Sequence, residues 1–288
     1  MLKERIISAI ILIAIVLTAL LLFSPFYFAL ALGVVVTLGV WEWTQFARLK
    51  QDVWRFVITA IAGTFLFLWI YSQADYLNAG RGFVGYAEPL LLAAVVWWIL
   101  VTSQVISYPK SAVLWGKSVL LQLIFAFLTL IPFLIGVLLL RLNQYAVDQY
   151  HGFILLMYVF VLVWAADSGA YFAGRKFGKR KLAPKVSPGK SWEGAVGGLI
   201  TACIFAFVFL QLSKDSLIGN ASASSFVVLS VATVAISVLG DLTESMFKRE
   251  SGIKDSSQLI PGHGGILDRI DSLTAAVPFF TYFYFFVL

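Results

Sequence analysis

Residues 116–140 read GKSVLLQLIFAFLTLIPFLIGVLLL, and no charged residue follows Lys117 in this run. A helix needs roughly 20 apolar residues to cross a hydrocarbon core about 30 Å thick, so this run is long enough to span a bilayer. The rest of the chain is similar, since 60% of its 288 residues are hydrophobic and 12% are charged. A soluble globule could not bury that much apolar surface, so we expect lipid to be the solvent.

Hydropathy predicts an all-α polytopic integral membrane protein with about nine transmembrane helices in a single domain, 1–288. The run Ile6–Phe23 follows Lys3 and Arg5 like a secretory signal, but it lacks a clear small-residue cleavage site, so we interpret it as a retained span. The N-terminal spans occupy about 1–140, and the spans of about 150–288 carry most of the polar residues. The predicted spans lie near 6–23, 26–46, 55–72, 89–107, 116–140, 152–173, 192–212, 225–240 and 273–288.

The basic residues fall almost entirely on one side of these spans. Eighteen of the 21 Lys and Arg residues lie in loops of the side that carries the N-terminus, and only Arg81, Arg141 and Lys214 lie on the other side. The positive-inside rule therefore predicts a cytoplasmic N-terminus and places Leu288 outside. This pattern explains the net charge of +6 without nucleic acid as a partner. The single cysteine, Cys203, excludes a disulfide framework or a thiolate metal site.

Asp167 lies in the segment 164–171, WAADSGAY, which closes the predicted sixth span. A carboxylate buried unpaired in lipid costs several kcal/mol, so it is expected to face a cavity, an ion or a partner. We favour a role in lining a site. The alternative is a structural ion pair with a base such as Arg175 or Lys190.

Residues 185–194, KVSPGKSWEG, follow a run of bases and suggest a phosphate-binding loop. Ser187 and Pro188 are interpreted as the N-cap and first residue of a helix, which would direct free backbone N–H groups at an anion near Lys190 and Ser191. The loop is not a nucleotide-binding phosphate loop, because Pro184 stands where such a loop needs glycine. For the preceding bases, binding to anionic lipid is an equal alternative.

The stretch 240–272 carries the richest set of polar residues. Asp241, Glu244, Ser245 and Lys248 are spaced i, i+3, i+4 and i+7 and so share one face of a predicted helix. Asp268 and Asp271 stand at the start of the last predicted span. Two pairs of carboxylates at span ends form an oxygen-rich pocket suited to Mg²⁺, which takes one or two carboxylates plus phosphate oxygens.

Between these pairs, Pro261–Gly265 reads PGHGG and predicts a turn whose bare backbone could approach a pyrophosphate closely. Positive charge would come from Lys248, Arg249, Lys254 and Arg269. The alternative is a solvated loop with ordinary salt bridges. His263 in this turn could equally act as a general base or as a positioning group.

The stretch from Ser245 to Asp271 resembles the signature of phosphatidate cytidylyltransferases, also called CDP-diacylglycerol synthases, and the resemblance to the bacterial family extends over the full length. The segments WAADSGAY and KVSPGKSWEG are similar to family segments as well. The matching signature residues are Ser245, Lys248, Arg249, Lys254, Asp255, Pro261, His263, Gly264, Gly265, Asp268, Arg269 and Asp271.

The resemblance implies a Mg²⁺-dependent reaction of CTP with phosphatidate in phospholipid biosynthesis, at the cytoplasmic face of a bacterial inner membrane, with a homodimer as one possible assembly. It implies that Asp241 and Asp268 are metal ligands. Catalytic or supporting roles fall to Asp271, Lys248, Arg249, Arg269, Asp167 and Glu244. Substrate-binding roles fall to Lys185, Ser187, Lys190, Ser191, Lys254, Gly262, His263, Gly264 and Gly265.

Two rival functions remain open at this point. The lipid substrate could be a polyprenyl or phytyl phosphate, because nothing in the sequence reveals recognition of acyl chains. A transporter would instead use Asp167, Glu193 and Asp241 to line a cation or proton path. Transport carboxylates should lie near mid-span, whereas most of these carboxylates lie at predicted span ends beside a glycine turn, which disfavours transport.

Overall fold

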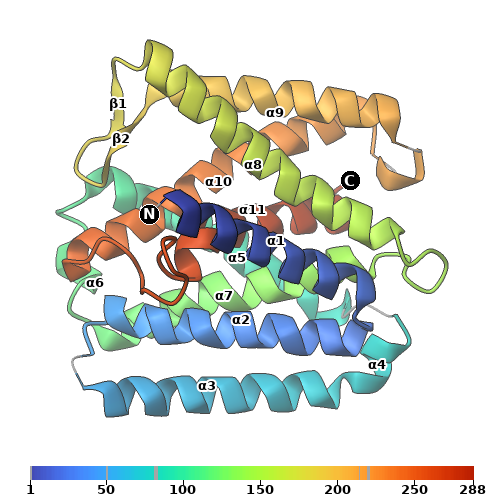
Figure 1. Cartoon of the computed structure of the whole chain (residues 1–288), viewed down its shortest axis with the longest axis horizontal. Helices are drawn as coiled ribbons and strands as arrows, with labels where there is room; N and C mark the ends of the chain where they lie inside the picture. The colour runs from blue at the N-terminus through green and yellow to red at the C-terminus, as the bar shows by residue number, and fades with distance from the viewer. Residues whose placement is uncertain (1, 50, 81–83, 214, 219–220) are drawn as a thin grey trace.

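The computed structural model describes the chain except residues 1, 50, 81–83, 214, 219 and 220 (Figure 1). The described part is almost entirely helical, as the sequence predicts, with one short hairpin. The long helices are α1 (Leu2–Leu22), α2 (Pro25–Phe46), α3 (Asp52–Ser72), α5 (Val84–Ser107), α7 (Val119–Leu142), α8 (His151–Phe177), α9 (Trp192–Leu212), α10 (Ala223–Ser251) and α11 (Leu267–Phe286). The short elements are α4 (Ala74–Asn78), α6 (Ala112–Trp115), β1 (Lys181–Ala183), β2 (Ser187–Ser191) and η1 (Asp215–Ile218).

Seven helices of the described chain are long and apolar enough to cross a membrane: α2, α3, α5, α7, α8, α9 and α10. The polytopic architecture is thus confirmed. In α1 the apolar part, Ile10–Leu22, is shorter than a full membrane span. Helix α11 begins with the charges of Asp268, Arg269 and Asp271. Nine spans therefore stay a prediction, as does the side of the membrane on which the N-terminus lies.

The predicted eighth span ends too soon, and the predicted ninth span begins too late. α10 continues past residue 240 to Ser251, and α11 begins at Leu267 rather than at 273. Hydropathy finds only the lipid-compatible part of a helix, whereas backbone hydrogen bonding continues through the polar turns at its end. Gly252 then ends α10 in the left-handed conformation, with φ of 74°, and its N–H donates to the carbonyls of Lys248 and Arg249.

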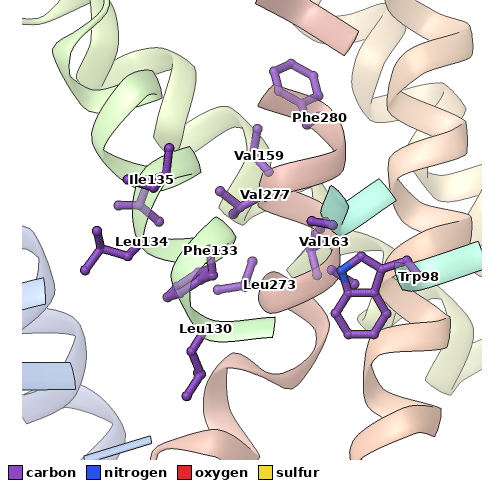
Figure 2. Packing of buried hydrophobic residues seen from close by; sticks show 14 of the residues in the cluster. Trp98, Leu130, Phe133, Leu134, Ile135, Val159, Val163, Leu273, Val277 and Phe280 are labelled. Carbon is purple, nitrogen blue, oxygen red and sulfur yellow. The ribbon is translucent and has the colours of Figure 1, made fainter. Parts of the chain in front are cut away.

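Figure 1 shows α2 and α3 side by side along one flank and α8 with α9 along the other, with α7, α10 and α11 between them. Figure 2 shows buried side chains from three elements of this core meeting, such as Phe133 of α7, Val163 of α8 and Leu273 of α11. Helices α10 and α11 approach closely at Gly240, where a Cβ atom would lie 2.6 Å from the carbonyl oxygen of Asp271. The start of α11 is thereby held against the polar end of α10.

The polar connections predicted for one face gather at one end of the helix bundle. The start of α1, the β1–β2 hairpin, α6 and the loop between α10 and α11 lie at the left of Figure 1, and α4 and the C-terminus lie at the right. This arrangement brings the motifs 185–194 and 240–272 to the same end of the molecule.

The predicted helix start at Ser187 and Pro188 is wrong. Residues Ser187–Ser191 form β2, which pairs antiparallel with β1. Helix α9 begins at Trp192, and its N-cap is Ser191, whose Oγ accepts the N–H of Gly194 at 3.2 Å. Pairing with β1 outweighs the local preference of Ser-Pro for a helix start, and a two-stranded ribbon tolerates proline because each strand has a free edge.

Candidate active site

A buried lysine joins the polar ends of α10 and α11. Lys248 Nζ lies 2.6 Å from Asp268 Oδ1 and 3.3 Å from Glu244 Oε1. The side chains are 11%, 6% and 6% exposed for Lys248, Glu244 and Asp268. One helical turn separates Glu244 from Lys248, so the predicted shared face of α10 is confirmed for this pair. Poor access to water strengthens the attraction in this triad.

Asp268 also closes the loop between α10 and α11. Its Oδ2 atom accepts the backbone N–H groups of Ser256 and Gly265, both at 2.8 Å, and the hydroxyl of Ser256 at 2.9 Å. Both carboxylate oxygens of Asp268 are therefore engaged, one by Lys248 and the other by the loop.

A second carboxylate, which sequence reasoning missed, holds the same loop from α2. Glu42 is fully buried and accepts the hydroxyls of Ser256 and Ser257 at 3.0 and 2.6 Å. It also accepts the N–H groups of Ile266 and Leu267 at 2.9 and 2.7 Å. The signal was present, because Glu42 is a carboxylate inside a predicted span, like Asp167. No local pattern pointed to Ser256 or Ser257.

The hairpin carries Lys190 to the middle of α10. Lys190 Nζ lies 2.7 Å from Asp241 Oδ2, and the two side chains are 26% and 30% exposed. Asp241 Oδ1 accepts the hydroxyl of Ser245 at 3.3 Å, which confirms that this residue shares the polar face of α10. Asp167 on α8 is close enough to interact electrostatically with Lys190 and Asp241. Three motifs that are distant in sequence thus form one charged cluster.

Glu244 and Asp271 line a small cavity of about 10 Å³ between α10 and α11, which has room for about one water molecule. Both carboxylate oxygens of Glu244 are buried without a hydrogen-bond partner among the described residues. Asp271 Oδ1 accepts the N–H of Ser272 at 2.7 Å.

A larger cavity of about 690 Å³ lies against the loop between α10 and α11, within the size range of small-molecule sites. His263 in its wall is within hydrogen-bonding distance of α1, because its Nδ1 atom lies 2.7 Å from Ser8 Oγ. The lining includes five predicted site residues: Lys254, Gly262, His263, Gly264 and Arg269.

Two glycines of the turn have roles in packing. The amide of Gly265 already donates to Asp268, and a Cβ atom there would overlap Ser256 Oγ and lie 2.5 Å from Glu42 Oε1. Gly264 has φ of 84°, and a Cβ atom there would lie 2.6 Å from Asp268 Oδ2. Close packing of the carboxylates and the serine therefore requires glycine at position 265, and phosphate binding by this turn stays a prediction.

The other predicted site residues in and beside the hairpin have no described contact with the carboxylates of the site. Lys185 is exposed in the turn, and no hydrogen bond described by the structure joins Lys185 or Ser187 to the carboxylates. Arg249 Nε donates to the carbonyl of Val186 at 3.3 Å, so it holds the hairpin against α10. Ser191 caps α9, which engages its hydroxyl.

Glu193 closes the base of the hairpin. Its carboxylate accepts the backbone N–H of Lys179 at 3.1 Å and that of Arg180 at 3.2 Å. This contact gives Glu193 a structural function at the hairpin and removes the reason for placing it in a transport path.

The donor atoms fit a magnesium ion only if substrate oxygens complete its shell. The described residues contain no group of three or more His, Cys, Asp or Glu that could hold a metal ion. Asp241 Oδ1 has one long hydrogen bond and is open to a cation, whereas Asp268 can bind one only if Lys248 is released. Since Mg²⁺ needs only one or two carboxylates besides water and phosphate, this set suits an ion that is shared with a nucleotide.

Comparison with known proteins identifies the family of the chain. A family model described as the cytidylyltransferase family matches residues 3–287. A phosphatidate cytidylyltransferase of Haemophilus influenzae is 69% identical over 288 residues, which is 100% of both chains. One of Pseudomonas aeruginosa is 46% identical over 281 residues, covering 97% of this chain and 96% of its own. The chain therefore belongs to the cytidylyltransferase family.

Proposed function

We propose that this protein is a phosphatidate cytidylyltransferase, which converts CTP and phosphatidate into CDP-diacylglycerol and pyrophosphate. The observation that carries the proposal is the 69% identity, along the whole chain, to a relative that bears this name. The charged clusters at one end of the bundle supply the groups that such a transfer needs.

The reaction joins two polyanions and needs little acid–base chemistry. An oxygen of the lipid phosphate, already ionised, attacks the α-phosphorus of CTP in line. The bond from that phosphorus to the bridging oxygen breaks, and pyrophosphate leaves with the electron pair. Catalysis then consists of positioning the two phosphates and of stabilising the charge that builds on the leaving group.

The 690 Å³ cavity is the proposed place for the nucleotide. Lys254 and Arg269 in its wall would bind the triphosphate, and His263 would orient it through a ring nitrogen. Lys248 lies behind this wall, paired with Asp268, and would stabilise the departing pyrophosphate if the pair opened. Lys190 and Asp241 form the second charged group, on the side of the hairpin.

Magnesium is part of this proposal. Bound by Asp241 with phosphate oxygens of the substrate, Mg²⁺ would screen the charge of CTP and polarise its phosphorus. Asp268 is the second proposed ligand and would exchange Lys248 for the ion. Asp271, Glu244 and Asp167 are the proposed supporting residues beside these ligands.

The lipid enters from the bilayer in this proposal. The acyl chains stay among the lipids, and only the phosphate reaches the polar ends of the helices. With eighteen Lys and Arg predicted on one side, the positive-inside rule supports a cytoplasmic location for this end. The proposed membrane is the inner membrane of a bacterium.

The test is an assay of detergent-purified protein with radiolabelled CTP, Mg²⁺ and phosphatidate, which follows label in the lipid phase and pyrophosphate in the aqueous phase. Polyprenyl phosphate and no lipid serve as controls. Incorporation that requires phosphatidate supports the proposal. Incorporation into polyprenyl phosphate alone would reassign the lipid, and no incorporation by folded protein would reject the transferase. Light scattering of the same preparation tests the proposed homodimer.

A further inference from the structure

We propose that Glu42 is a positioning residue for cytidylyl transfer: from α2 it fixes the α10–α11 loop, and through Ser256 it sets the place of Asp268. This inference rests on the proposed function. Glu42 lies outside the motifs 164–171, 185–194 and 240–272, and it reaches the site only through the tertiary fold.

Each carboxylate oxygen of Glu42 has two donors. Oε1 accepts the hydroxyl of Ser257 and the N–H of Ile266, and Oε2 accepts the hydroxyl of Ser256 and the N–H of Leu267. All four donors are uncharged. The side chain is 0% exposed, so these bonds replace the water that a carboxylate would otherwise bind.

Two of these donors belong to the N-terminus of α11. The first N–H groups of a helix have no partner within the helix, and Ile266 supplies no capping side chain. Glu42 supplies the acceptors from another helix, and its charge is favourable beside the positive end of α11. The first turn of α11, which carries Asp268, is therefore anchored to α2.

Ser256 links Glu42 directly to Asp268. Its hydroxyl oxygen lies 3.0 Å from Glu42 Oε2 and 2.9 Å from Asp268 Oδ2, and its backbone N–H donates to Asp268 at 2.8 Å. One hydroxyl carries one hydrogen, so it donates to only one carboxylate at a time. A shift of Glu42 therefore changes whether the Ser256 hydroxyl donates its hydrogen bond to Asp268. Asp268 in turn lies 2.6 Å from Lys248, so the change reaches this ion pair.

The loop held in this way also forms the wall of the 690 Å³ cavity. Ser257, whose hydroxyl donates to Glu42 at 2.6 Å, is one of the lining residues, as are Lys254 and Gly264. Release of this loop would move the cavity wall and the Lys248–Asp268 pair together. We therefore expect a loss of both nucleotide affinity and turnover.

The test compares Glu42→Gln with wild type, using kcat and separate KM values for CTP and phosphatidate. Glutamine keeps the size of the side chain but turns an NH₂ group toward donors, so it breaks at least one pair of these bonds. Because misplacement by about 1 Å can cost about 100-fold in rate, we expect kcat to fall about 100-fold. We also expect KM for CTP to rise, while KM for phosphatidate stays unchanged.

Tyr158→Phe is the matched control for stability. It removes one buried hydrogen bond, from Tyr158 to Ser230 at 2.5 Å, within the same bundle and away from the loop. This variant should melt at a lower temperature yet keep wild-type kcat and KM per folded molecule. A merely structural Glu42 would behave in the same way.

Ser256→Ala gives a second, milder variant and closes a double-mutant cycle with Glu42→Gln. If both residues act through one hydrogen-bonded unit, their effects on kcat should be strongly non-additive. Unchanged kcat and KM for CTP in folded Glu42→Gln, or additive effects in the cycle, would overturn the inference. Absence of turnover by wild type would instead reject the proposed function, and the inference with it.

Discussion

The ammonium nitrogen of Lys190 lies 2.7 Å from Asp241 Oδ2, which joins the hairpin to the polar face of α10. A similar pair forms between Lys248 and Asp268 at 2.6 Å. Both aspartates are the proposed metal ligands, so each expected ligand holds a lysine in this structure. We therefore expect substrate loading to exchange these lysines for Mg²⁺.

Asp241→Asn should abolish activity with little effect on stability. The Lys190–Asp241 pair is partly exposed, and such pairs stabilise a fold by at most about 1 kcal/mol. Loss of a charge that faces the reacting phosphates should lower turnover by about 100-fold or more. Asp52→Asn, which removes an exposed charge paired with Arg55, is the control. Turnover of the purified variant near the wild-type value would contradict the metal assignment.

Lys248→Met should destabilise the fold as well as lower activity. Removal of one partner of a buried ion pair costs about 3–5 kcal/mol, because the carboxylates of Glu244 and Asp268 are left without their cation. Thermal unfolding in detergent measures this effect. Lys110→Met, at an exposed position, should melt like wild type. Equal melting temperatures for the two variants would show that the triad of Lys248, Glu244 and Asp268 does not stabilise the fold.

Gly265→Ala should distort the loop between α10 and α11, because the added Cβ atom overlaps Ser256 Oγ and crowds Glu42. Overpacking of this kind costs about 1–3 kcal/mol. Gly189→Ala is the matched control, since a Cβ atom at this position in β2 meets nothing within 4 Å. The melting temperature and the turnover of CTP are measured for both variants. A Gly265→Ala variant with the wild-type values of both would refute the packing argument.

Chelation of magnesium should stop turnover without unfolding the protein. The described residues contain no protein-only metal cluster, so an ion bound with CTP contributes little to the stability of the free enzyme. We expect EDTA to abolish formation of CDP-diacylglycerol, the melting temperature without CTP to stay unchanged, and excess Mg²⁺ to restore activity. A large drop in melting temperature on chelation would point to a structural metal instead.

The topology predicts opposite labelling of two loops. In a Cys203→Ser background, Lys110→Cys should react with an impermeant maleimide only from the cytoplasmic side, and Gln149→Cys only from the outside. Intact cells and inverted vesicles separate the two sides. Labelling of both positions from one side would overturn the predicted orientation.

Several parts of the site could be predicted from local sequence. The spacing of Asp241, Ser245 and Lys248 follows the helical period, so their shared face needed no tertiary information. Hydropathy predicts Asp268 and Asp271 at the start of the last span, and both lie in the first turns of α11. The predicted helix at Ser187 failed, because strand pairing with residues 181–183 is a contact between segments that composition does not reveal.

The sequence by itself determined the membrane class, the approximate helices and the motifs that carry charge. These follow from hydropathy and from helical periodicity, which are properties of neighbouring residues. Only the tertiary structure decided which charges meet: Lys190 with Asp241, Lys248 with Asp268, and Glu42 with the loop. Glu42 lies 214 residues from Ser256 in the chain, and such a contact depends on how α2 packs against α11 rather than on any local pattern.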